Sequence, residues 1–203
     1  MPLPHKPRLI VVAGPNGSGK TSLTQKLLDH EWAKGCLHIN PDEIAKAKYG
    51  DWDKKENFIA AARDAEQLRE ECLQEKRELI FETVLSRPDK IEFIIRAYHA
   101  GYFIRLFYVG TNHPAINAAR ITYRYMDGGH EVAISRIVQR YNKSIANCVV
   151  VSQFVDRTYV YDNSVDHRDP VRMFRARNGR IDRSLSQIEP WAEPIFTVLS
   201  VKA

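Results

Sequence analysis

Residues 14–21 place the strongest constraint on how this chain can fold. They read Gly-Pro-Asn-Gly-Ser-Gly-Lys-Thr, which is a complete G-x-x-x-x-G-K-[ST] phosphate-binding loop. An apolar run, Leu9 to Ala13, precedes the loop, and a helical pattern from Thr21 to Asp29 follows it. Glycines allow backbone N–H groups to surround phosphate oxygens, and a helix N-terminus adds partial positive charge. The segment predicts a nucleoside triphosphate site; the alternative is a Gly-rich turn without a ligand.

The loop also suggests roles for individual side chains. Lys20 is expected to reach the β- and γ-phosphates of ATP, and the Thr21 hydroxyl is expected to bind Mg²⁺. The predicted nucleotide-binding residues are Gly14, Pro15, Asn16, Gly17, Ser18, Gly19, Lys20, Thr21 and Ser22. ATP and Mg²⁺ are therefore the expected cofactors.

Length and composition are those of an ordinary globular chain. The 203 residues predict a single domain, 1–203. The formal net charge of +5 suits anionic substrates, but acidic residues are interspersed throughout, so charge discriminates poorly between substrates. No membrane-spanning run and no signal segment is expected, and the expected location is the cytoplasm. Three widely spaced cysteines predict free, mostly buried thiols.

Apolar strand-like runs alternate with helical patterns, which predicts an α/β fold around a mostly parallel sheet. The predicted strands are 8–13, 36–39, 79–81, 102–109 and 157–161. The predicted helices are 21–29, one that opens at Pro41, 56–77, 88–100, 114–126, 131–148 and a last one within 185–201. Asn178-Gly179 predicts a hairpin turn between 171–176 and 180–182.

Two large classes of phosphate-loop protein lack support in the rest of the chain. Transporter-type ATPases carry an LSGGQ-like signature and an apolar strand ending in Asp-Glu, and neither occurs here. Guanine-recognition patterns of the Asn-Lys-x-Asp kind are also absent. The remaining motifs must therefore indicate what the nucleotide is used for.

An acidic pair follows the second predicted strand, in Asn40-Pro41-Asp42-Glu43. A carboxylate at the carboxyl edge of a parallel strand points into the crevice where α/β sheets bind ligands. There it can accept the proton of an acceptor hydroxyl and orient that oxygen for phosphoryl transfer. Asp42 is thus the candidate catalytic base; the alternative is an acidic pair that only stabilises a helix dipole.

The third predicted strand runs into Glu82-Thr83. If the sheet is doubly wound, these residues lie beside the phosphate-loop strand. Glu82 could then hold a substrate hydroxyl or a Mg²⁺-bound water. The alternative is a polar strand end without a ligand.

Four arginines flank Gly128-Gly129-His130, in two pairs with helical i, i+4 spacing: Arg120 with Arg124, and Arg136 with Arg140. Such arginines beside a Gly-Gly hinge suit a mobile lid, where guanidinium groups neutralise the transferring phosphoryl group. One alternative is a solvated basic face. A nucleic-acid groove is another, because tyrosines that could stack bases interleave with these arginines.

A last polar segment, Tyr161-Asp162-Asn163-Ser164, follows the fifth predicted strand. A loop there could contact the nucleotide base or the substrate. The residue types by themselves favour a plain Asx-type turn.

Together these motifs resemble the zeta-toxin family of P-loop kinases. The resemblance covers Leu9 to about Ser164 and is carried by Gly14 to Thr21, Asn40 to Ile44, Glu82 to Ser86, Gly128 to His130, Arg140-Tyr141 and Tyr161 to Ser164. It implies a nucleotide-kinase-like sheet with a helical lid at about 114–148. It also implies ATP- and Mg²⁺-dependent phosphorylation of a sugar hydroxyl. The best-known acceptor in the family is UDP-N-acetylglucosamine, which is modified on the 3′-hydroxyl of its amino sugar.

The resemblance also implies a role for each candidate residue. Lys20 and Thr21 would bind triphosphate and Mg²⁺, Asp42 would be the general base, and Glu82 with Thr83 would lie on the substrate side. Arg120 and one of Arg136 or Arg140 would contact phosphate as catalytic lid residues. Arg124 and His130 are further candidates for substrate binding.

The chain departs from the family pattern in two respects. It is shorter than the well-known toxins, and it has Val132-Ala133 where many relatives have Val-Pro. Some relatives phosphorylate other nucleotide-like acceptors, including NAD. The expected partners are a nucleotide-sugar or other nucleotide-like acceptor and a small helical antitoxin, rather than a membrane or a nucleic acid. The open alternatives are a nucleotide-dependent nucleic-acid-binding protein or nucleic-acid kinase, and a module that binds ATP without transferring phosphate.

Overall fold

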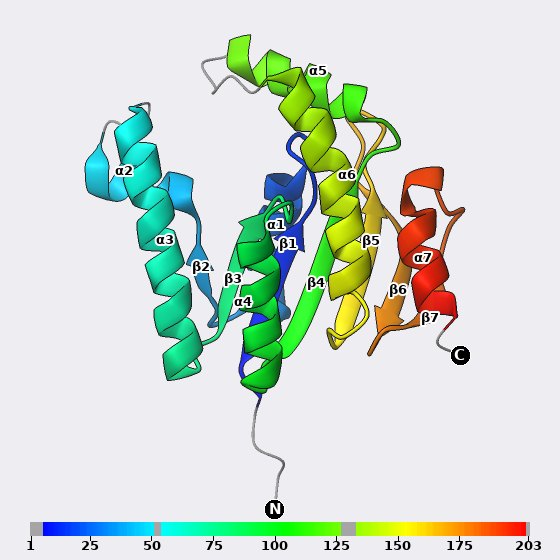
Figure 1. The fold of residues 1–203 in the computed structure, drawn as a ribbon, viewed down its shortest axis with the longest axis horizontal. Helices are drawn as coiled ribbons and strands as arrows, with labels where there is room; N and C mark the ends of the chain where they lie inside the picture. The colour runs from blue at the N-terminus through cyan, green and yellow to red at the C-terminus, as the bar shows by residue number, and fades with distance from the viewer. Residues whose placement is uncertain (1–5, 51–53, 127–132, 202–203) are drawn as a thin grey trace, which may run out of the picture.

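The computed structural model describes residues 6–50, 54–126 and 133–201. These residues form a seven-stranded sheet with the strand order β2-β3-β1-β4-β5-β6-β7 (Figure 1). The strands are β1 (Arg8–Ala13), β2 (Leu37–Ile39), β3 (Leu79–Thr83), β4 (Phe103–Gly110), β5 (Arg157–Asp162), β6 (Val171–Arg177) and β7 (Arg180–Ser184). Strands β1 to β5 pair in parallel, whereas β6 and β7 are antiparallel. The predicted α/β class with a mostly parallel sheet is confirmed.

Helices cover the two faces of this sheet unequally. The helices are α1 (Lys20–Leu28), α2 (Pro41–Tyr49), α3 (Lys55–Glu75), α4 (Pro88–His99), α5 (Pro114–Met126), α6 (Ile134–Val151) and α7 (Glu193–Ser200), with 3₁₀ helices at Glu31–Ala33 and Pro190–Ala192. Figure 1 shows α3, α4, α6 and α7 in front of the sheet and α1 behind it. Helices α5 and α6 fall in the segment predicted as a lid; α5 lies at the upper edge of the sheet, and α6 runs from there down its front face.

The last predicted helix lies within its expected range of 185–201 and occupies only the second half of it. Residues 185–189 are not helical, and α7 starts only at Glu193, after the 3₁₀ helix. The two prolines at positions 190 and 194 explain this start, because proline lacks an N–H donor and suits only the first turn of a helix.

The pairing register brings three strand ends to one edge of the sheet. Glu82 of β3 lies opposite Val12 of β1, and Ile39 of β2 lies opposite Phe81. The segments that follow β1, β2 and β3 therefore leave the sheet at the same edge. The predicted position of Glu82 beside the phosphate-loop strand is confirmed.

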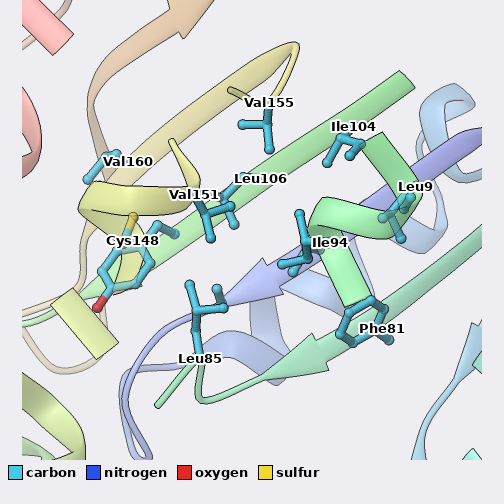
Figure 2. Close-up of a cluster of buried hydrophobic side chains, with 14 of the residues drawn as sticks. Leu9, Phe81, Leu85, Ile94, Ile104, Leu106, Cys148, Val151, Val155 and Val160 are labelled. Carbon is cyan, nitrogen blue, oxygen red and sulfur yellow. The ribbon is translucent and has the colours of Figure 1, made fainter. Parts of the chain in front are cut away.

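Two hydrophobic clusters hold the layers together, one on each face of the sheet. Figure 2 shows the larger cluster, where Leu9 and Phe81 of the sheet meet Ile94 of α4 and Val151 of α6. The smaller cluster packs Leu23 and Leu27 of α1 against the other face. Complete burial of each such side chain contributes roughly 1.5–3 kcal/mol, so the clusters fix the strands that carry the polar edge.

The described residues contain no helix that is both long and apolar enough to cross a membrane. The three cysteines are free thiols, as predicted, with Cys72 and Cys148 buried and Cys36 partly exposed.

Candidate functional site

The loop between β1 and α1 has a backbone that only glycine tolerates. Gly14, Gly17 and Gly19 have φ angles of 149°, 78° and 93°. A Cβ atom on Gly14 would lie 2.1 Å from the carbonyl oxygen of Val109, and one on Gly17 would lie 2.7 Å from that of Asn117. The glycines therefore permit both the turn and its close packing on β4 and α5.

Lys20 folds back over the loop from the first turn of α1. Its Nζ donates to the carbonyl oxygens of Gly14 and Pro15, both at 2.9 Å. These contacts hold the ammonium group on the side of the loop where a phosphate chain would be bound. A phosphate oxygen is a stronger partner for an ammonium group than a carbonyl oxygen, so the side chain can exchange these contacts for a nucleotide.

Thr21 and Glu82 place oxygen atoms together beside the loop. The Thr21 hydroxyl donates to Glu82 Oε2 at 3.1 Å. Glu82 Oε1 is buried and has no hydrogen-bond partner among the described residues. A buried carboxylate oxygen without a partner is costly, and oxygen is the ligand that Mg²⁺ prefers. The pair therefore fits a Mg²⁺ ion held partly by nucleotide phosphates.

The described chain shows no other group of side chains suited to a metal. No cluster of three or more His, Cys, Asp or Glu residues with suitable geometry lies within it. Mg²⁺ in phosphoryl-transfer enzymes commonly uses few protein ligands, with waters and substrate phosphates supplying the rest. Thr21 and Glu82 match that mode of binding.

Two asparagines from distant segments hold the loop. Asn117 Nδ2 donates to the Asn16 carbonyl at 2.7 Å, and Asn163 Nδ2 donates to the Ser18 carbonyl at 2.8 Å. Asn117 belongs to α5, whereas Asn163 follows β5. These two hydrogen bonds fix the carbonyl groups of the loop, and the neighbouring N–H groups are thereby held in place as well. The loop therefore has the shape of a phosphate-binding site before a nucleotide binds.

No sequence motif predicts the role of Asn117. This residue lies in a helix with no recognisable motif, 101 positions from its partner. Asn163 belongs to the singled-out segment after the fifth strand, but its contact with the phosphate loop was not predicted. Only the fold reveals either role, because both partners are backbone atoms that any residue type presents.

The same network reaches the second lid helix. The Thr111 hydroxyl donates to Asn117 Oδ1. The Tyr141 hydroxyl of α6 in turn donates to the Thr111 carbonyl at 2.5 Å. Burial raises the pKa of Tyr141 to about 12, so the phenol remains a donor at neutral pH. A continuous path of hydrogen bonds thus joins α6 to the phosphate loop.

Among the lid arginines, Arg120 contacts the loop directly. Its Nη1 donates to the Gly17 carbonyl at 3.3 Å, while Nε and Nη2 lie 2.8 and 2.7 Å from Asp166 Oδ1. In the described contacts, Arg136 and Arg140 do not reach the loop; they are exposed and partly exposed on α6. The side chain of Arg124 and the whole of His130 lie outside the described residues.

Asp42 lies in the first turn of α2, after β2. Asn40 caps this helix, because its Oδ1 accepts from the Asp42 backbone N–H at 2.9 Å. The Asp42 carboxylate is not used as the cap, and the residue is exposed at the same edge as the phosphate loop. The neighbouring Glu43 lies 3.4 Å from His38 Nδ1. The structure therefore leaves Asp42 accessible to an acceptor.

Thr83 contributes to the local turn. Its hydroxyl accepts from the Leu85 N–H at 2.9 Å, and Leu85 has a φ of 55°. This bond shapes the segment that leads into α4. The hydroxyl predicted to bind substrate is thus engaged with its own backbone.

The predicted Asx-type turn at Asp162 is confirmed. The Ser164 N–H donates to Asp162 Oδ2 at 3.1 Å. Trp191 Nε1 donates to Asp162 Oδ1 at 2.9 Å, which ties the turn to the C-terminal segment. The turn thereby positions Asn163 against the phosphate loop.

Comparison with known proteins agrees with this geometry. The chain matches the zeta toxin family over residues 1–176. An uncharacterised protein of Haemophilus influenzae is 29% identical over 141 residues, which cover 66% of this chain and 92% of that protein. A structure from the PezAT chromosomal toxin–antitoxin system of Streptococcus pneumoniae has a TM-score of 0.57 at 18% identity, covering 82% of this chain and 70% of that chain.

A second solved structure, the AvrRxo1-ORF1:AvrRxo1-ORF2 complex with ATP, has a TM-score of 0.58 at 15% identity. The match covers 98% of this chain and 65% of that chain. Identities this low show a shared fold, whereas the family match extends over most of the sequence and includes the complete phosphate loop. The chain therefore belongs to the zeta toxin family and is an ATP-dependent kinase.

Proposed function

We propose that this kinase transfers the γ-phosphoryl group of ATP to a sugar hydroxyl of a nucleotide sugar such as UDP-N-acetylglucosamine. We place this activity in the cytoplasm, as the toxin of a toxin–antitoxin pair whose antitoxin is a small helical protein. The observation that carries the proposal is the shared edge of the sheet. The phosphate loop, Glu82 and Asp42 follow the neighbouring strands β1, β3 and β2 at that edge.

On the donor side, Lys20 leaves the carbonyl oxygens of Gly14 and Pro15 and binds the β- and γ-phosphates. Arg120 already contacts the loop at Gly17 and can turn from the exposed Asp166 carboxylate toward the transferring group. Because guanidinium forks match phosphate oxygens, this exchange stabilises negative charge during transfer.

Thr21 and Glu82 are the residues that would hold Mg²⁺. When bound, the ion would neutralise charge on the β- and γ-phosphates. The Glu82 carboxylate has one oxygen on Thr21 and one buried oxygen without a described partner, so it can serve the ion or a water bound to it.

On the acceptor side, Asp42 orients the sugar hydroxyl and accepts its proton. The hydroxyl oxygen forms a bond to the γ-phosphorus as the bond to the β,γ-bridging oxygen breaks, and ADP leaves. An exposed carboxylate suits this role because the acceptor must approach it from solvent.

The test is mass spectrometry of reactions that contain the protein, ATP and Mg²⁺. UDP-N-acetylglucosamine, NAD and a short RNA are offered in separate reactions. We expect a mass gain of one phosphoryl group on UDP-N-acetylglucosamine, located on the sugar by fragmentation. Gain on NAD or RNA alone would overturn the nucleotide-sugar assignment while leaving the kinase activity intact.

Lys20→Ala provides the control for the phosphate loop. We expect its product to fall by roughly a thousandfold or more, because charge stabilisation by such a residue is among the largest catalytic terms. Its circular dichroism spectrum and thermal unfolding midpoint should remain those of the parent. Undiminished transfer by a folded Lys20→Ala protein would overturn the mechanism.

A further inference from the structure

One face of β5, β6 and β7 carries arginines in register. Arg157 lies opposite Arg177, and Arg175 lies opposite both Tyr159 and Arg183. Arg172 lies opposite Tyr161. Directly opposed residues in antiparallel strands share a face of the sheet. We call this set, namely Arg157, Arg172, Arg175, Arg177 and Arg183 with Tyr159 and Tyr161, the arginine face.

The charge of this region is concentrated and poorly balanced. Residues 171–184 contain five arginines and one aspartate, a net charge of +4, whereas the whole chain has +5. Asp182 bonds to Arg175 Nη2 at 2.8 Å and also pairs with Arg177. Asp182 is therefore the one carboxylate within residues 171–184 for five arginines.

The helices of the described chain leave this face largely uncovered. Helix α7 packs on the opposite face, where Phe196 meets Phe174 at 5.3 Å between ring centroids. On the arginine side, Trp32 covers Tyr159. Their ring centroids lie 5.5 Å apart, and Tyr159 is 3% exposed. Figure 1 likewise shows α6 and α7 in front of these strands and α1 behind the strands nearer the middle of the sheet.

Protection of an exposed sheet edge does not account for the pattern. Charged side chains on an edge strand prevent unwanted pairing, which explains Arg183 on β7. Arg157 and Arg175 lie on inner strands opposite Arg177 and Arg183, and like charges directly opposite one another destabilise a sheet. The Nε of Arg172 is moreover buried without a partner among the described residues. These costs point to an anionic ligand that offsets them.

We infer that the arginine face binds single-stranded nucleic acid. Guanidinium forks pair with phosphate oxygens, and arginines two residues apart on a strand lie about 6.8 Å from each other, within reach of successive phosphates. Planar groups accompany the charge: Tyr161 is partly exposed, and the Arg157 guanidinium lies 5.4 Å from the centroid of Phe103. Bases stack on such surfaces, whereas an acidic peptide would use the charge alone.

This surface is separate from the phosphate loop and does not depend on the identity of the acceptor. It differs from the sequence-based expectation, which named no nucleic acid as a partner. That expectation stays a prediction. The face was not recognisable from the sequence because Arg157 and the arginines of residues 171–184 become one surface only through the pairing of three strands.

The test is fluorescence anisotropy with a labelled 20-nucleotide single-stranded RNA over a series of salt concentrations. Unlabelled RNA, single-stranded DNA of the same length and poly-glutamate serve as competitors. The variant is Arg177→Glu/Arg183→Glu, which changes two exposed residues. The matched control is Arg63→Glu/Lys143→Glu, which makes the same charge change at exposed positions on α3 and α6. A second variant, Arg177→Gln/Arg183→Gln, removes the two charges without reversing them. Thermal unfolding checks that each variant is folded.

We expect the parent to bind RNA with a steep salt dependence, and the Glu variant to bind at least about tenfold more weakly at about 50 mM salt. The salt slope should fall by about two, roughly one for each lost phosphate contact. The matched control should retain parental binding, and the Gln variant should lose part of it. Competition by DNA as strong as by RNA would assign recognition to the phosphate chain, and a preference for RNA would add recognition of the 2′-hydroxyl.

Three outcomes would overturn the inference. One is an absence of RNA binding at low salt, and another is an equal loss in the two charge-reversal variants. The third is displacement of RNA by poly-glutamate at equal charge concentration, which would indicate an acidic protein partner instead. Kinase activity of the Arg177→Glu/Arg183→Glu variant on small acceptors should remain parental, so this test is independent of the proposed acceptor.

Discussion

The phosphate loop and helix α2 lie at the same edge of the sheet, yet the protein holds them in different ways. The loop receives partly buried hydrogen bonds from Asn117, Asn163 and Arg120, and its Gly14 and Gly17 pack against other backbone. Helix α2 has one buried residue, Ala45, among its nine. Asp64 of α3 accepts an exposed hydrogen bond from Lys48 of α2 and a partly buried one from Tyr49.

Under the proposed function, this difference separates a preformed site for the phosphate donor from an adaptable site for the acceptor. A triphosphate chain is the same in every reaction, so a rigid cradle loses little by being specific. An exposed helix with few buried contacts can shift with small changes in free energy. Variation of the acceptor among related kinases is therefore compatible with one constant phosphate loop.

The largest expected effect comes from disturbing the rigid side. Gly14→Ala places a Cβ atom 2.1 Å from the Val109 carbonyl oxygen, and a backbone clash cannot be relieved by a rotamer change. We expect the free energy of unfolding to fall by about 3 kcal/mol or more, as measured by urea denaturation. The matched control is Gly50→Ala after α2, which has a φ of 68° and no neighbour within 4 Å.

For Gly50→Ala only backbone strain applies, so we expect a loss of about 1 kcal/mol. Similar losses in the two variants would contradict the contrast between a packed loop and a loosely held helix.

Asp42→Asn tests the chemistry of the adaptable side. We expect turnover to fall roughly a hundredfold or more, because a positioned base typically contributes that much. Binding of ATP, measured by calorimetry, should be unchanged. Glu43→Gln at the next exposed position should retain parental turnover. If the two variants behaved alike, Asp42 would be an ordinary acidic residue of the first helical turn.

Asn163→Ala removes one support of the phosphate loop without touching a nucleotide. Loss of the bond to the Ser18 carbonyl should destabilise the protein by about 1–2 kcal/mol and raise the KM for ATP roughly tenfold. The KM for the acceptor should remain parental. Asn142→Ala, at an exposed position of α6, is the control. An unchanged KM for ATP would show that the loop keeps its shape without this contact.

The smallest effect concerns the attachment of α2. Hydrogen bonding from Lys48, and then from Tyr49, lowers the pKa of Asp64 in the folded protein. Its contribution to stability is therefore present at neutral pH and is lost as the pH falls through this lowered pKa, below about pH 4. Asp64→Asn should have a slightly lower Tm than the parent at pH 7 and the same Tm in acid. A Tm difference that persisted unchanged in acid would rule out this ion pair as its cause.

Local patterns predicted most of the elements because they depend on neighbours in sequence. The boundaries of β1 and α5 agree with the structure residue for residue, and those of β2 to β5 differ by one or two residues at one or both ends. The Asn178-Gly179 turn was also recognisable. The main exception is the helix expected at 131–148, since α6 spans Ile134–Val151.

The sequence by itself determined the phosphate loop, since Gly14 to Thr21 requires a strand before it, a helix after it and glycines between them. It also placed Asp42 and Glu82 at strand ends. Tertiary structure alone decided that Asn117, Asn163 and Arg120 support the loop, and that five arginines share one open face. The physical reason is that loop geometry is local, whereas these contacts arise only when strand pairing and core packing bring distant segments together.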